Sequence, residues 1–102
     1  MINCIIAMDV VGVCFGGSNR NLPTDAIVAL PGSIGTLDEL FDALAQKKLG
    51  LINCHIGVLD VNGFFDPLFE LLQNSRNLGF TSEKAFAMLK SGRTPEELFQ
   101  KF

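Results

Sequence analysis

The apolar residues of this chain form short uninterrupted runs that alternate with stretches of helical spacing. The runs at residues 26–30 and 55–60 are typical of strands that are covered on both faces of a sheet. Between them, from about Gly35 to Lys48, apolar residues recur at helical spacing, with Gly50 as a stop. We therefore predict two adjacent parallel strands joined by a helix that crosses between them.

Further elements are predicted on both sides of this unit. Residues 2–15 indicate one long or broken strand, with Asp9 and Gly12 marking a break. Residues 66–79 predict a helix with Asp66 as its N-cap and proline next, and residues 94–97 predict the start of another. Residues 84–90 are short and bounded by serines, which favours a third strand of the sheet.

The alternation of strands and helices from residue 26 onward predicts the α/β class, as a parallel sheet with helices on both faces. The polar connection at residues 18–24 is too short for a crossover helix to a parallel strand. At 102 residues with 48% hydrophobic residues, the whole chain, 1–102, is expected to form a single domain with one core.

Charge and cysteine content narrow the possible partners and compartments. The net charge of −3, without a basic patch, argues against a broad nucleic-acid interface. Cys4, Cys14 and Cys54 are an odd number without paired spacing, so neither a disulfide framework nor a zinc site is indicated, and reduced thiols point to the cytoplasm. The apolar start lacks a basic leader and is interrupted by Asp9 well short of a membrane span.

The turn at residues 31–39, P-G-S-I-G-T-L-D-E, carries the clearest chemical signal. It links a strand to a helix, so backbone N–H groups and the positive end of the helix dipole face outward, where anions bind. The expected phosphate donors are the N–H groups of Gly32, Ser33, Gly35 and Thr36, helped by two hydroxyls. No lysine follows the glycines, which excludes a Walker loop.

A purely structural interpretation of the same turn stays open. Thr36 and Glu39 have the spacing of a capping box, and the glycines would then only permit a tight turn. In the functional interpretation, Glu39 faces a sugar or leaving group beside the phosphate and stabilises positive charge or moves a proton. Arg20 is either a phosphate clamp or a solvated loop residue. His55 is interpreted as structural.

Residues 24–39, T-D-A-I-V-A-L-P-G-S-I-G-T-L-D-E, resemble the signature of the LONELY GUY family, long labelled lysine decarboxylase-like. That signature is P-G-G-x-G-T-x-x-E directly after an apolar strand containing A-D-x-x-I-A-L, and Ser33 replaces its second glycine. The resemblance continues through residues 57–68, the Gly79-Phe80 pair and residues 94–98. Residues 25–102 match the family, whereas residues 1–24 diverge from it.

The resemblance implies a Rossmann-like phosphoribohydrolase that needs no cofactor and no metal. Its substrates would be cytokinin riboside 5′-monophosphates, or a related nucleoside 5′-monophosphate such as AMP, cleaved to free base and ribose 5-phosphate. By the resemblance, Gly32, Gly35 and Thr36 would hold the phosphate and Glu39 would be the catalytic carboxylate. We add Ser33 as a phosphate ligand and Arg20 as the accompanying catalytic cation. The resemblance also implies a homodimer. With the cysteine content and the charge, we expect a cytoplasmic protein without nucleic-acid or membrane partners.

Two departures from the family support a rival interpretation. Family members are usually longer, with an amino-terminal half that supplies another glycine-rich loop and an R-K pair. In this chain Arg20 is followed by asparagine and lies nearer the motif, so the fold is expected to be truncated relative to the family. The alternative is a non-catalytic nucleotide-binding or oligomerising remnant of the same family.

Overall fold

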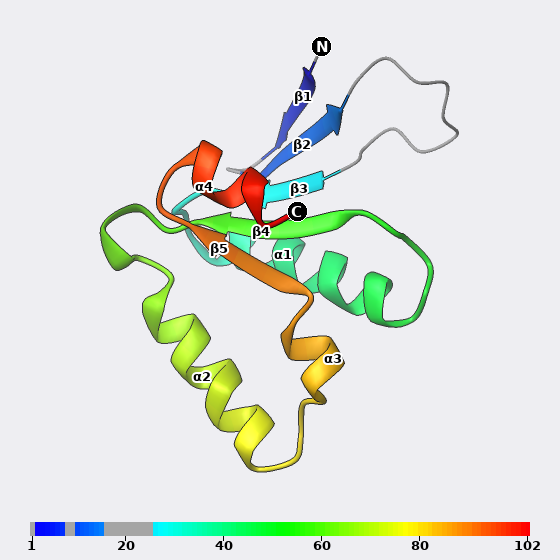
Figure 1. The fold of residues 1–102 in the computed structure, drawn as a ribbon, viewed down its shortest axis with the longest axis vertical. Helices are drawn as coiled ribbons and strands as arrows, with labels where there is room; N and C mark the ends of the chain where they lie inside the picture. Colours follow the sequence, from blue (N-terminus) through cyan, green and yellow to red (C-terminus); the bar gives the residue numbers. More distant parts are fainter. Residues whose placement is uncertain (1, 8–9, 16–25) are drawn as a thin grey trace.

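The computed structural model describes residues 2–7, 10–15 and 26–102 of the chain (Figure 1). Its strands are β1 (Ile2–Ala7), β2 (Val10–Phe15), β3 (Ala26–Ala29), β4 (His55–Leu59) and β5 (Leu89–Gly92). Its helices are α1 (Ile34–Lys48), the short 3-10 helix η1 (Val61–Gly63), α2 (Asp66–Asn77), α3 (Glu83–Phe86) and α4 (Pro95–Gln100). None of the helices in these ranges combines the length and apolarity needed to cross a membrane.

The five strands form one sheet in the order β1-β2-β3-β4-β5. The last three strands are parallel, with Ala26 opposite His55 in the β3–β4 pair and Val58 opposite Ser91 in the β4–β5 pair. The predicted pairing of residues 26–30 with 55–60 is thereby confirmed, with α1 as the helix between them. As a result, the carboxyl ends of β3, β4 and β5 meet at the same edge of the sheet.

The amino-terminal strands run differently from the other three. β1 and β2 pair antiparallel with each other, and β2 pairs antiparallel with β3. The predicted break in the apolar segment falls between Ala7 and Val10, whereas Gly12 lies inside β2, opposite Ile5 and Ile27, so the prediction of a break at Gly12 was wrong. Because β2 and β3 are antiparallel, the chain needs no crossover helix here; the connecting residues 16–25 lie outside the described ranges.

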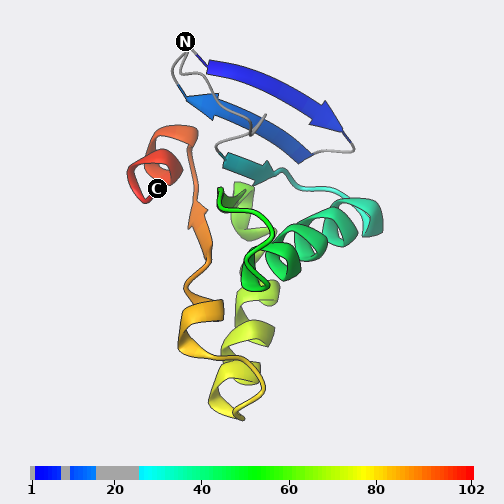
Figure 2. The same ribbon diagram turned by 90° about the vertical axis from the view of Figure 1, so that its right-hand side faces the viewer.

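Helices cover both faces of the parallel strands, as the sequence predicted (Figures 1 and 2). On one face α1 and α2 cover the larger cluster of buried side chains, which includes Leu40, Ile56, Val58 and Phe65. On the other face Leu98 of α4 packs on Ala26 and Val28 of β3. This α/β, Rossmann-like arrangement holds β3 and β4 rigidly between two apolar layers.

The strand predicted at residues 84–90 was wrong in its first half, because α3 occupies Glu83–Phe86 and β5 begins at Leu89. The Ser82 hydroxyl accepts a hydrogen bond from the N–H of Ala85 at 3.1 Å and caps α3. Arg76 of α2 lies 4.4 Å above the Phe86 ring and 3.5 Å from the Glu83 carboxylate. These contacts with α2 favour the helical turn over an extended strand.

Two predicted helix starts had different outcomes. α4 begins as expected, because Thr94 is its N-cap and the Thr94 hydroxyl accepts from the N–H of Glu97 at 3.1 Å. Asp66 was predicted as the N-cap of α2 but is its first helical residue, and Phe65 precedes it as the cap. The N–H of Phe65 donates to the Asp60 carboxylate at 2.7 Å. This bond holds Phe65 in the capping position, so the helix begins one residue earlier than predicted, at Asp66.

Candidate functional site at the carboxyl edge of the sheet

The turn between β3 and α1 leaves the start of a long helix open. Ser33 is the N-cap, in extended conformation, and its hydroxyl makes no capping hydrogen bond. Its carbonyl accepts from the N–H of Leu37 at 3.2 Å. The N–H groups of the first turn of an α-helix point out of its end and carry partial positive charge. This end of the 15-residue helix α1 therefore has the geometry of an anion site.

The four predicted phosphate-binding residues lie in or directly before the first turn of α1. Gly32 and Ser33 precede the helix, and Gly35 and Thr36 are its second and third residues. Ser33 is exposed, whereas Thr36 is only 2% exposed. The capping-box interpretation requires Thr36 to precede the helix, but α1 begins at Ile34, so that interpretation was wrong.

Glu39 lies one helical turn beyond the open end of α1. It is three residues after Thr36 and four after Gly35, so all three share one face of the helix. Glu39 is half-buried, and its carboxylate forms no hydrogen bond or ion pair with residues 26–102. Its neighbour Asp38 is exposed, as predicted. The carboxylate of Glu39 is therefore available to a ligand that sits on this face.

The loop that follows β4 brings a buried carboxylate to the same edge of the sheet. Asp60 is 3% exposed and accepts from the N–H of Phe65, while its own N–H donates to the carbonyl of Gly92 at 2.8 Å. Between these anchors Asn62 and Gly63 take positive φ values of 52° and 73°. Asp60 thus ties the β4–α2 turn to the end of β5.

Asp66 lies against Asp60, a juxtaposition that the sequence analysis missed. The hydrogen bond between the two side chains is the main reason that the pKa of Asp66 lies above its usual value. Desolvation and the negative charge of Asp60 raise this pKa further, while the charge of Arg93 opposes the rise. One signal was available, because Asp60 and Arg93 each directly follow a parallel strand and such positions meet at one edge.

The raised pKa of Asp66 predicts a pH-dependent effect of Asp66→Asn. Asp66 takes up a proton in the folded chain at a higher pH than in the unfolded chain. The wild type therefore gains stability as the pH falls toward 3.8, the ordinary pKa of an aspartate side chain. The variant lacks this titration, and its stability relative to wild type should therefore rise from pH 4 to pH 7. Urea unfolding at several pH values measures the difference, and a difference that is constant with pH would contradict the pairing of the two carboxyls.

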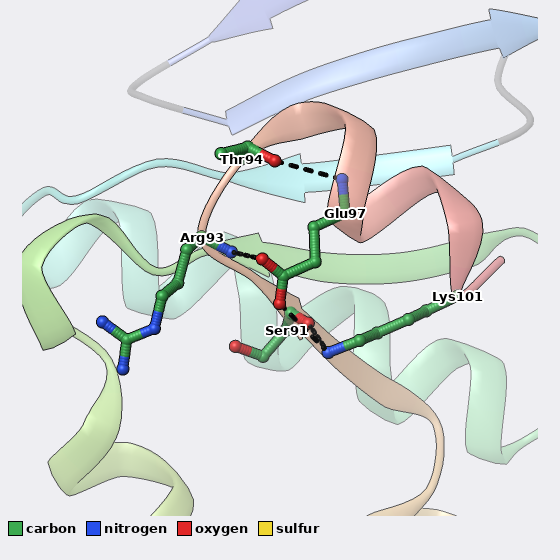
Figure 3. Close-up of polar contacts among 5 residues, drawn as sticks. All are labelled: Ser91, Arg93, Thr94, Glu97 and Lys101. Carbon is green, nitrogen blue, oxygen red and sulfur yellow. Dashed lines mark hydrogen bonds and ion pairs between the residues drawn. The ribbon is translucent and has the colours of Figure 1, made fainter.

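Arg93 brings a positive charge to this edge from the end of β5 (Figure 3). The backbone N–H of Arg93 donates to the Glu97 carboxylate at 3.3 Å. The Lys101 ammonium lies 3.8 Å from the same carboxylate and also donates to the Ser91 carbonyl. The Arg93 guanidinium points away from Glu97 in Figure 3 and forms no hydrogen bond or ion pair with the described residues. Its charge, which also acts on Asp66, lies at the edge where the motif turn lies.

The remaining predicted residues lie elsewhere. Arg20 is outside the described residues. His55 is the first residue of β4, at the opposite edge of the sheet, where its ring stacks on Phe102 with centroids 5.0 Å apart. Among the residues that the structure describes, no three His, Cys, Asp or Glu side chains are grouped to hold a metal ion.

The comparisons with known proteins all point to one family. The family model described as "Possible lysine decarboxylase" matches residues 22–102. "Cytokinin riboside 5'-monophosphate phosphoribohydrolase LOG" of Oryza sativa subsp. japonica is 38% identical over 77 residues, which are 76% of this chain and 32% of that protein. "Probable cytokinin riboside 5'-monophosphate phosphoribohydrolase LOGL2" of the same plant is 36% identical over 78 residues, again 76% of this chain and 32% of the relative.

A relative from a second plant covers the same part of the chain. "Cytokinin riboside 5'-monophosphate phosphoribohydrolase LOG3" of Arabidopsis thaliana is 35% identical over 78 residues, which are 76% of this chain and 36% of the relative. The chain therefore spans about a third of the length of the curated relatives that it matches. The matched part contains the motif turn, β4 with its loop, and α4.

Proposed function

Because this chain belongs to the family described as possible lysine decarboxylase, to which the LONELY GUY proteins belong, we propose that it is a phosphoribohydrolase. Its substrates are cytokinin riboside 5′-monophosphates or a related nucleoside 5′-monophosphate such as AMP. One observation carries the proposal: the start of α1 and the carboxylate of Glu39, which has no partner among residues 26–102, share a helix face at the carboxyl edge of the sheet. That is the edge where α/β sheets bind nucleotides.

In this proposal the 5′-phosphate binds at the motif turn. The N–H groups of Gly32, Ser33, Gly35 and Thr36 provide donors, and the exposed Ser33 hydroxyl adds another. Arg20 stays the proposed accompanying cation because it is the only arginine upstream of the motif turn in the sequence, although it departs from the R-K pair of the family. The guanidinium of Arg93, at the end of β5, supplies a second positive charge at this edge.

The ribose would then extend along α1 toward Glu39. Water adds to C1′ of the ribose as the bond from C1′ to the base nitrogen breaks, and the base leaves with a proton from solvent or a bound acid. The Glu39 carboxylate stabilises the positive charge that develops on the ribose ring and accepts the proton of the attacking water. The products are the free base and ribose 5-phosphate.

We also propose that the chain forms a homodimer in the cytoplasm. Large apolar side chains are exposed on and beside the helices, a pattern typical of association surfaces: Ile34, Leu49, Leu51, Leu71, Leu78 and Phe80. Cys54 is a free, buried thiol, which agrees with a reducing compartment.

Release of free base from a matched pair of substrates tests the proposed function. Isopentenyladenosine 5′-monophosphate and AMP should each yield free base and ribose 5-phosphate when incubated with the protein and separated by liquid chromatography. Isopentenyladenosine, which lacks only the phosphate, should react at least about tenfold more slowly, because phosphate binding positions the ribose.

Two results would contradict the proposal in different ways. Equal rates for the nucleotide and the nucleoside would show that the phosphate makes no contact that matters for the reaction, which would contradict a phosphate site at the motif turn. Binding of AMP by calorimetry without any release of base would instead establish the non-catalytic, nucleotide-binding alternative.

A further inference from the structure

A cationic hollow lies at the edge of the sheet opposite the motif turn, where β4 and β5 begin. Its volume is about 300 Å³, which is at the lower end of the range for small-molecule sites. Four cationic or titratable side chains line it together with three apolar ones: Lys47, His55, Lys84, Lys90, Ile56, Ala87 and Met88. We refer to it below as the lysine hollow.

The charge of the lysine hollow is opposite to that of the chain. The chain carries a net charge of −3, yet three of its eight lysine and arginine residues line this one space. None of the lining residues is acidic. Glu83, which is next to Lys84 in the sequence, lies 3.5 Å from Arg76 of α2 and so already has a cationic partner. The positive charge of the hollow therefore lacks a counter-charge among its lining residues.

Four different elements bring these side chains together. Lys47 comes from the end of α1, His55 from the start of β4, Lys84 from α3 and Lys90 from β5. The Lys47 ammonium donates to the Cys54 carbonyl, and the stacked Phe102 ring holds the His55 ring at an interplanar angle of 14°. Two of the four groups are thus fixed in place before any ligand arrives, which lowers the entropy cost of binding.

A structural explanation covers only part of this cluster. Lysine in the last turn of a helix is favourable with the helix dipole, which accounts for Lys47 at the end of α1. It applies only weakly to the exposed Lys84, because α3 is a single turn of four residues, and it does not apply to the half-buried Lys90 of β5, although both line the same space. Like charges that converge on one space repel each other, and a multiply charged anion would relieve that repulsion.

We propose that the lysine hollow binds a small molecule that carries phosphate groups, at a site separate from the motif turn. Lysine ammonium groups bind phosphate as point charges, and three of them from separate elements surround a ligand of high charge density. Ile56, Ala87 and Met88 provide an apolar wall for the rest of the molecule. Because the hollow lies at the amino ends of the strands, its ligand does not compete for the carboxyl edge.

Titration with pyrophosphate, followed by NMR, tests this site. His55 is the only histidine in the chain, so its imidazole signals report on the hollow without overlap. They should shift in a saturable manner, and Lys84→Gln should weaken binding about tenfold because it removes one charge-assisted contact. Lys48→Gln is the matched control: it removes the same charge from an exposed lysine that does not line the hollow, and it should change binding less than twofold.

Three results would overturn the proposal. The first is the absence of a saturable shift of the His55 signals at millimolar pyrophosphate. The second is equal weakening by Lys84→Gln and Lys48→Gln, which would show general attraction to positive charge. The third is a set of shifts confined to the amides of residues 32–36, which would place the ligand at the motif turn instead.

Discussion

Glu39→Gln is expected to lower the rate of N-glycosidic hydrolysis by about a hundredfold or more. Glutamine keeps the size and the acceptor oxygen of the side chain but removes the negative charge that would stabilise the ribose ring in the transition state. The free energy of unfolding should change little, because the Glu39 carboxylate forms no hydrogen bond or ion pair with residues 26–102. Binding of AMP should persist, since the proposed phosphate donors lie before Glu39, in or directly before the first turn of α1.

Asp38→Asn is the matched control for this variant. It removes the same charge from the adjacent residue, which is exposed, and it should leave the hydrolysis rate within about twofold of wild type. Steady-state rates and urea unfolding of the two variants, measured together, separate a local role from a general effect of charge. Equal rates for Glu39→Gln and wild type would remove Glu39 from the mechanism.

Gly92→Ala should lower the free energy of unfolding by about 3 kcal/mol or more, the upper range for overpacking. A Cβ atom at Gly92 would lie 2.5 Å from the backbone nitrogen of Leu98 and 2.6 Å from its Cα. Backbone atoms of α4 cannot turn aside as a side chain does, and the hydrogen bond from the Lys101 ammonium to the Ser91 carbonyl anchors this end of the chain to β5. The substitution should therefore lift α4 off the sheet.

Gly57→Ala, one strand away, gives the comparison. The nearest atom to its added Cβ is Cδ1 of the Leu98 side chain, at 2.7 Å, which can move by a change of rotamer. We expect a loss of about 1 kcal/mol here, clearly smaller than at Gly92. Urea unfolding of both variants measures the two losses, and similar values would mean that α4 shifts easily on the sheet.

The central part of the fold followed directly from the sequence. Residues 26–30 and 56–59 carry no polar side chain because both faces of β3 and β4 are covered, and the helical spacing between them defined α1 to within one residue. The open turn before α1 was also predicted, since it depends only on neighbours in the sequence.

Features that depend on tertiary contacts could not be predicted in this way. Residues 84–90 suit a strand as well as a helix, and the choice is made by Arg76 of α2, which contacts Phe86 and Glu83. The position of Asp66 depends in the same way on the bond between Phe65 and Asp60.

The candidate site was predicted where it is local and missed where it is assembled from distant segments. Glu39 and the phosphate donors lie in one continuous stretch. Asp60, Asp66 and Arg93 come together through the parallel pairing of β4 and β5, and the signal for this was that Asp60 and Arg93 each directly follow a strand. Arg20 lies outside the described residues, and its role stays a prediction.

Amide hydrogens are expected to exchange at different rates in the central strand β4 and in the short helix α3. β4 is hydrogen-bonded to strands on both sides, and Ile56, Gly57 and Val58 are buried, so its amide hydrogens should exchange with solvent only when the whole sheet opens. α3 is a single turn with no buried residue, and its amides should exchange through small local fluctuations. The loop after β4 is thus attached to a strand expected to exchange slowly, whereas Lys84 at the opposite edge lies on a segment expected to exchange by local opening.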